Sequence, residues 1–83
     1  MRIDVFLKKS RLIKRRIIAQ EACDKGLISV NDKQVKQSYN VSVNDIVTLA
    51  LGSKTIKVKV TSLLTNNDTL MYDLISENYL GQN

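Results

Sequence analysis

The sequence predicts an α+β fold in which two N-terminal helices pack on a small, twisted antiparallel sheet. Apolar residues recur at the spacing of a helix face up to residue 25, and they alternate with polar residues after Gly26. Short polar turn sequences separate the alternating segments, as is typical of hairpins. At 83 residues, the chain has room for one domain with a thin core.

Both predicted helices lie before Gly26. The first covers about residues 2–9, and its apolar residues share one helix face: Ile3, Phe6 and Leu7. Asp4 stands four residues before Lys8, which is the favourable order for an intrahelical ion pair, and it is also placed to orient an arginine through a salt bridge. The second helix covers about residues 13–25, and Gly26 follows because it adopts the left-handed backbone that ends a helix easily.

The remainder of the chain is predicted to form strands joined by polar turns. In chain order the predicted strands are residues 28–30, a return strand beginning at Val35, residues 46–51, residues 55–62 and a last strand at 71–75 with a frayed tail. The segment 55–62 alternates most regularly, with apolar residues on one face and lysine or threonine on the other. The turns are predicted at 31–32, 42–45 and 52–53, and a polar loop at 65–69.

The composition argues against several classes of protein. The chain has no histidine, a single cysteine and three glycines, so we expect no disulfide, no metal site, no cofactor and no catalytic residue. Cys23 is expected to be a small buried hydrophobic residue. No apolar run approaches the ~20 residues that span a bilayer, and the start lacks the apolar stretch of a signal peptide. We therefore expect a cytoplasmic protein that is not an enzyme and has no membrane partner.

The positive charge is concentrated in the first half of the chain. Residues 1–36 contain ten basic and four acidic residues, whereas residues 37–83 contain three and four. Six cations lie between Lys8 and Arg16 with no acid among them. Arginine suits bidentate phosphate contacts, so this block predicts binding to nucleic acid. Structured RNA fits better than DNA, because no basic helix places asparagine or glutamine for base edges.

The predicted RNA contacts are the basic residues of this first half: Arg2, Lys8, Lys9, Arg11, Lys14, Arg15, Arg16, Lys33 and Lys36. Arg2 is expected at the start of the first helix and Arg16 in the first turn of the second. Phe6 is expected in the core, while Tyr39 lies in a polar loop where it could stack on a base. The alternative interpretations of the basic block are a solvated face, a surface for an acidic protein and a membrane-surface helix.

The junction between the second helix and the first strand has a recognisable pattern. It reads Arg16-x-x-Ala19, then Ala22-Cys23-x-x-Gly26-x-Ile28-x-Val30-Asn31-x-Lys33. This resembles the signature of the RNA-binding domain named after ribosomal small-subunit protein four. The segments Arg2-Ile3-Asp4-x-Phe6-Leu7 and Val43-Asn44-Asp45 extend the resemblance over residues 1 to about 60. The chain departs from that family at Asp32 and Asn44, where glycine is usual, and at Arg15, where serine is usual.

The resemblance implies an αL-like RNA-binding motif over residues 1–60, with residues 61–83 completing the same domain and forming a tail. The chain most resembles the short, stand-alone RqcP family of bacterial ribosome quality control, and next the ribosome-associated heat-shock proteins of the same fold. Such a factor would be monomeric when free. It would bind the obstructed large ribosomal subunit through rRNA and peptidyl-tRNA, and support alanine tailing by an RqcH-type factor. The alternatives are a heat-shock-type recycling factor and a basic interaction module of a larger RNA enzyme.

Overall fold

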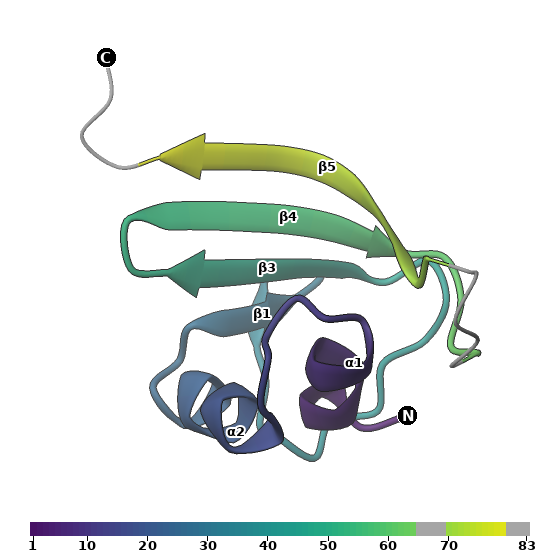
Figure 1. Cartoon of the computed structure of the whole chain (residues 1–83), viewed down its shortest axis with the longest axis horizontal. Coiled ribbons are helices and arrows are strands. Elements are labelled where there is room, and N and C mark those ends of the chain that lie inside the picture. The colour runs from purple at the N-terminus through teal and green to yellow at the C-terminus, as the bar shows by residue number, and fades with distance from the viewer. Residues whose placement is uncertain (65–69, 80–83) are drawn as a thin grey trace.

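Two helices pack on an antiparallel sheet in the computed structural model, which describes residues 1–64 and 70–79. Helix α1 spans Ile3–Lys9 and helix α2 spans Arg16–Asp24. The strands of the described residues are β1 (Ile28–Val30), β2 (Lys33–Gln34), β3 (Ile46–Leu51), β4 (Lys54–Val60) and β5 (Tyr72–Tyr79). Their spatial order is β2-β1-β3-β4-β5, and each neighbouring pair is antiparallel. Figure 1 shows the helices beside β1 and β3, with β5 at the far edge. The predicted fold class is confirmed.

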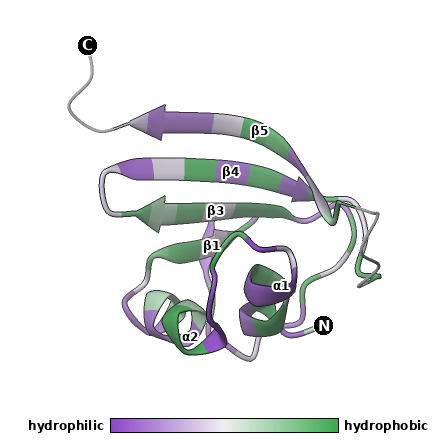
Figure 2. Ribbon diagram, viewed as in Figure 1, coloured by the Kyte–Doolittle hydropathy of each residue, from purple (hydrophilic) through white to green (hydrophobic). Residues whose placement is uncertain are grey.

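The core forms where the apolar face of α1 meets the sheet. Ile3, Phe6 and Leu7 are fully buried, as predicted. Helix α2 contributes small buried residues that allow close packing: Ala19, Ala22 and Cys23. The register places buried apolar residues opposite one another on neighbouring strands: Val30 and Val47, Ile28 and Leu49, Val47 and Val58, Leu49 and Ile56. Figure 2 shows apolar segments on both helices and on β1, β3 and β4. Burial of each large apolar side chain stabilises the fold by about 1.5–3 kcal/mol, so this core fixes the position of α1.

Helix α2 begins at Arg16, later than the predicted start at residue 13. Arg11 has left-handed backbone with a φ of 67°, so the chain turns sharply after α1. Ile13 reaches the core from this turn, and its N–H donates to the carbonyl of Leu7 at 3.0 Å. The earlier helix start was predicted because Ile13 fits the apolar spacing of a helix face, but Ile13 is a buried residue of the loop before α2.

The hairpin after β1 turns at residues 31–32, as predicted, but its return strand begins earlier than predicted. Asn31 and Asp32 both have positive φ, 52° and 69°, and Val30 pairs with Lys33 across this two-residue turn. Positive φ at both central residues is the geometry of the tight type I′ turn. The return strand is therefore β2, and the prediction that it begins at Val35 was wrong.

The last strand is longer than the predicted segment 71–75. Strand β5 continues to Tyr79, so the predicted fraying was wrong for residues 76–79, and the rest of the predicted tail lies outside the described residues. A register shift between Lys57 and Val58 interrupts its pairing with β4, and Leu74 and Ile75 are both exposed. Because neither face of β5 is uniformly apolar, apolar and polar residues do not alternate regularly along this strand. The predicted loop 65–69 lies outside the described residues.

Candidate nucleic-acid interface

Two of the predicted contact residues lie at the starts of the two helices. Arg2 precedes α1 with extended backbone, and Arg16 is the first residue of α2, as predicted. The two helices pack against each other. Both arginine side chains reach the same acid, Asp4, although twelve positions separate Arg16 from it in the sequence.

Asp4 is a fully buried carboxylate. Its Oδ1 accepts hydrogen bonds from Arg2 Nε at 3.2 Å and from the backbone N–H of Val5 at 2.8 Å. Its Oδ2 accepts from Arg2 Nη2 and Arg16 Nε, both at 3.2 Å, and from Gln20 Nε2 at 3.0 Å. A buried charge needs such partners, because an isolated carboxylate is very costly to remove from water. We call Arg2, Asp4, Arg16 and Gln20 the arginine cluster.

The arginine cluster fixes two guanidinium groups while leaving part of each open to solvent. The side chains of Arg2 and Arg16 are 42% and 49% exposed. A guanidinium carries five N–H donors, of which Arg2 gives two to Asp4 and Arg16 gives one. The other donors remain available to a ligand. Because the side chains are already ordered, binding costs less conformational entropy than it would for mobile arginines. Oriented guanidinium groups match the oxygen atoms of a phosphate.

Asp4 stays ionised at any pH near neutrality. Burial by itself would raise the pKa of Asp4, but its hydrogen bonds outweigh that effect. The bonds from Gln20, Arg16 and the Val5 N–H, together with the charge of Arg16, hold its pKa below the usual value. The carboxylate therefore remains an acceptor for both arginines, and the cluster keeps one surplus positive charge.

The other predicted contacts near the helices are exposed side chains. Lys8 and Lys9 lie in the last turn of α1, Arg11 and Lys14 lie in the turn that follows, and Arg15 directly precedes α2. Asp4 forms ion pairs with Arg2 and Arg16 and not the expected pair with Lys8, because its carboxylate is buried against the two arginines. The alternative prediction, that Asp4 orients an arginine through a salt bridge, is confirmed.

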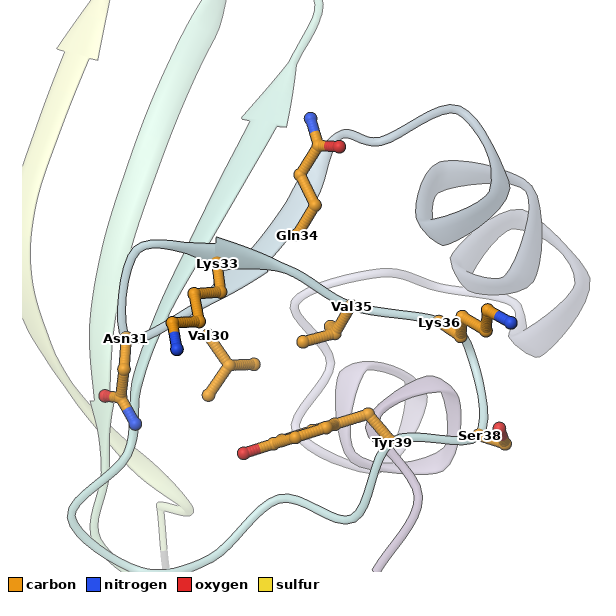
Figure 3. A pocket seen from close by; sticks show the side chains of 8 residues that line it. All are labelled: Val30, Asn31, Lys33, Gln34, Val35, Lys36, Ser38 and Tyr39. Atoms are coloured by element: carbon orange, nitrogen blue, oxygen red, sulfur yellow. The ribbon is translucent and has the colours of Figure 1, made fainter.

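The remaining two predicted contacts lie elsewhere. Lys33 is on β2 and Lys36 follows it, and both line a groove together with Tyr39 (Figure 3). Among the described residues, no ion pair or hydrogen bond joins either lysine to the arginine cluster. The structure therefore separates the nine predicted side chains into a helical group and a hairpin group.

Gln20 is the member of the arginine cluster that the sequence analysis missed. It lies four residues after Arg16, so the two side chains share a face of α2. The available signal was the four-residue spacing between Arg16 and Gln20, together with the acidic residue Asp4 in the first helix.

Ile17 and Ile18 follow Arg16 on α2. Unlike the core residues of that helix, their side chains are 67% and 48% exposed.

Cys23 is buried on α2, as predicted. Burial, followed by the negative charges of Asp4 and Asp24, raises the pKa of its thiol to about 11. A thiolate is the reactive form of cysteine, so this residue is inert near neutral pH. The described residues contain no group of three or more side chains that could hold a metal ion. None of the described helices is long and apolar enough to cross a membrane.

Comparison with known proteins identifies the family. The S4 domain matches residues 1–47, which include the arginine cluster and both strands of the hairpin. A protein of Bacillus subtilis named RQC P-site tRNA stabilizing factor is 43% identical, over 99% of this chain and 100% of its own length. The chain belongs to the RQC P-site tRNA stabilizing factor family of S4-domain proteins.

Further relatives agree with this membership. The RQC P-site tRNA stabilizing factor of Streptococcus pneumoniae is 41% identical over 100% of this chain and 99% of its own length. The solved trimeric structure of Vibrio cholerae Heat Shock Protein 15 is similar in fold, with a TM-score of 0.83. It covers 92% of this chain and 82% of the other at 20% identity, so that likeness concerns the fold. The predicted family resemblance, to the RqcP type first and the heat-shock type next, is confirmed.

Proposed function

We propose that this chain is a non-catalytic, cytoplasmic RNA-binding factor of ribosome-associated quality control. It binds the obstructed large ribosomal subunit by contacting rRNA and the peptidyl-tRNA in the P site. The observation that carries this proposal is the full-length similarity to relatives named RQC P-site tRNA stabilizing factor. The arginine cluster supports it, because two ordered and partly exposed guanidinium groups suit a phosphate backbone.

The proposed mechanism is positioning. The arginine cluster grips RNA backbone with donors that Asp4 already orients, and Lys8, Lys9, Arg11, Lys14 and Arg15 add longer-range attraction. A rigid helical face of this kind holds a tRNA in place without forming or breaking a covalent bond. By keeping the tRNA in the P site, the factor would support alanine tailing by an RqcH-type enzyme. Residues 1–60 would form the RNA-binding part, and residues 61–83 would complete the domain of a free monomer.

Electrostatics predicts how this binding responds to salt. Each phosphate that a cation neutralises releases condensed counterions, so the logarithm of the binding constant falls linearly with the logarithm of salt concentration. With four or five contacts, the slope would be about −3.6 to −4.5, using the duplex coefficient of ~0.9 per contact. Loss of one contacting arginine should make the slope shallower by about 1.

The test compares two variants that remove one positive charge each. Arg16→Gln removes a guanidinium of the arginine cluster, whereas Lys59→Gln removes an exposed cation from β4. Each tagged variant is sedimented with large ribosomal subunits through sucrose gradients across a salt series. The proposal expects the wild type and Lys59→Gln to sediment with large subunits that carry peptidyl-tRNA, and Arg16→Gln to stay near the top. Equally weakened association of the two variants would show that net charge, and not the arginine cluster, drives binding. Association of Arg16→Gln equal to that of the wild type would contradict the role of the cluster.

A further inference from the structure

A groove of about 570 Å³ lies next to the β1–β2 hairpin, and no residue of the arginine cluster lines it. Its apolar lining comes from Val30, Val35 and the ring of Tyr39. Figure 3 shows the Tyr39 ring extending beneath Val30 and Val35. Tyr39 is 38% exposed, so one part of the ring is accessible to a ligand. The volume is within the range of about 300–1,000 Å³ typical of small-molecule sites.

The charged lining of the groove is cationic. Lys33 and Lys36 both line it beside the neutral side chains of Asn31, Gln34 and Ser38, and no acidic residue does. Neither lysine forms a salt bridge within the described ranges 1–64 and 70–79. The amide of Asn31 is already used, because it donates to Asp45 and accepts from the N–H of Ile46. An apolar floor lined at its edge by Lys33 therefore suits a flat, anion-linked group.

The backbone around Tyr39 is fixed and is joined to the arginine cluster. The N–H of Tyr39 donates to the carbonyl of Lys36 at 3.0 Å, and its own carbonyl accepts from the N–H of Ile3 at 2.7 Å. The next residue, Asn40, forms an antiparallel bridge with Arg2. An RNA strand that contacts Arg2 would therefore pass close to the position of Tyr39.

From these observations we propose that the groove binds one unpaired RNA base, stacked on Tyr39, with Lys33 contacting a flanking phosphate. Aromatic side chains bind single-stranded RNA through such stacking, which tolerates any base. The inference rests on the proposed RNA-binding function and deepens it, because it adds an unpaired nucleotide to the phosphate contacts of the arginine cluster. An acidic protein segment would satisfy the lysines but would not require the exposed ring.

Tyrosine fluorescence tests the stacking directly. The chain has three tyrosines and no tryptophan, so the double variant Tyr72→Phe/Tyr79→Phe leaves Tyr39 as its single tyrosine. The probes are a single-stranded hexa-adenylate RNA and a glutamate hexapeptide, each added at low salt. We expect the RNA to quench Tyr39 emission and high salt to restore it. Unchanged emission while a gel shift shows bound RNA, no RNA binding at all, or equal quenching by the peptide would each overturn the proposal.

Binding affinity supplies the second measurement. Tyr39→Leu removes the ring but keeps an apolar side chain, and Tyr39→Phe keeps the ring. Because stacking on one aromatic side chain contributes ~1–3 kcal/mol, Tyr39→Leu should bind hexa-adenylate about 5- to 150-fold more weakly, and Tyr39→Phe should match the wild type. Equal affinity of all three proteins would overturn the stacking proposal. If the wild type still sediments with large subunits in that case, the proposed function stands and only this inference fails.

Discussion

Replacing Asp4 with asparagine separates positioning from net charge. Asparagine has nearly the same shape, but it removes the buried negative charge that accepts hydrogen bonds from Arg2, Arg16 and Gln20. It also places an N–H₂ group where one of the two carboxylate oxygens accepts from arginine. The variant carries one more positive charge than the wild type. If only charge mattered, Asp4→Asn would bind RNA more tightly.

The contacts of Asp4 indicate the size of the effect on stability. Breaking a buried pair costs about 3–5 kcal/mol, but the two arginines here are partly exposed and can regain water. We therefore expect Asp4→Asn to lower the free energy of unfolding by about 2 kcal/mol, within the range for hydrogen bonds to charged groups. For a domain of this size, that corresponds to a fall in Tm of roughly 8–16 °C.

The assay measures RNA affinity and folding on the same sample. Thermal unfolding is followed by circular dichroism, and binding to large ribosomal subunits is measured at a temperature where Asp4→Asn remains folded. Because Arg2 and Arg16 lose the negative charge and one of the two oxygens of their shared acceptor, we expect about 5- to 30-fold weaker binding, corresponding to ~1–2 kcal/mol of lost positioning. Binding that equals or exceeds that of the wild type, with the fold intact, would refute the role given to Asp4.

Three further predictions concern stability and reactivity. The pKa of Asp4 is lower in the folded protein than in the unfolded chain, where it is ~3.9. The stability that Asp4 contributes is therefore present above the unfolded pKa and is lost as the pH falls through the folded pKa. In urea unfolding between pH 5 and 2, the free energy of unfolding should fall more steeply for the wild type than for Asp4→Asn. The Cys23 thiol, with its pKa near 11, should react with iodoacetamide at pH 8 much more slowly in the native protein than in urea, and equal rates would contradict its burial. Gly26→Ala should destabilise by about 1–2 kcal/mol, because Gly26 has a φ of 73° and a Cβ there would lie 3.0 Å from the Gln34 side chain; an unchanged urea midpoint would argue against that strain.

Regular periodicity made much of the fold predictable. The helical spacing in α1 and the alternation in β1 and β4 each arise from one buried face, so the sequence records them directly. The start of α2 was harder, because Ile13 is buried from a turn and imitates a helical position. The extent of strand β5 was also hard to predict, because Leu74 and Ile75 are both exposed.

The sequence predicted candidate contacts by residue type but not their arrangement. Charge identified Arg16 within the dense basic block, and Arg2 before that block, as candidates. Their shared contact with Asp4 depends on how α1 packs against α2, which is a tertiary property. For the same reason the sequence pointed first to a pair between Asp4 and Lys8. Local spacing sets which residues share a helix face, whereas the fold decides which of them is buried.

The central claim is that this chain recognises a large ribosomal subunit that holds tRNA in its P site. The most direct measurement is the affinity of the purified protein for purified large subunits, prepared with and without peptidyl-tRNA, at one fixed salt concentration. We predict tighter binding to the subunits that carry peptidyl-tRNA, because rRNA and tRNA backbones are then both present. Equal affinity for the two preparations, or no binding to either, would contradict the account.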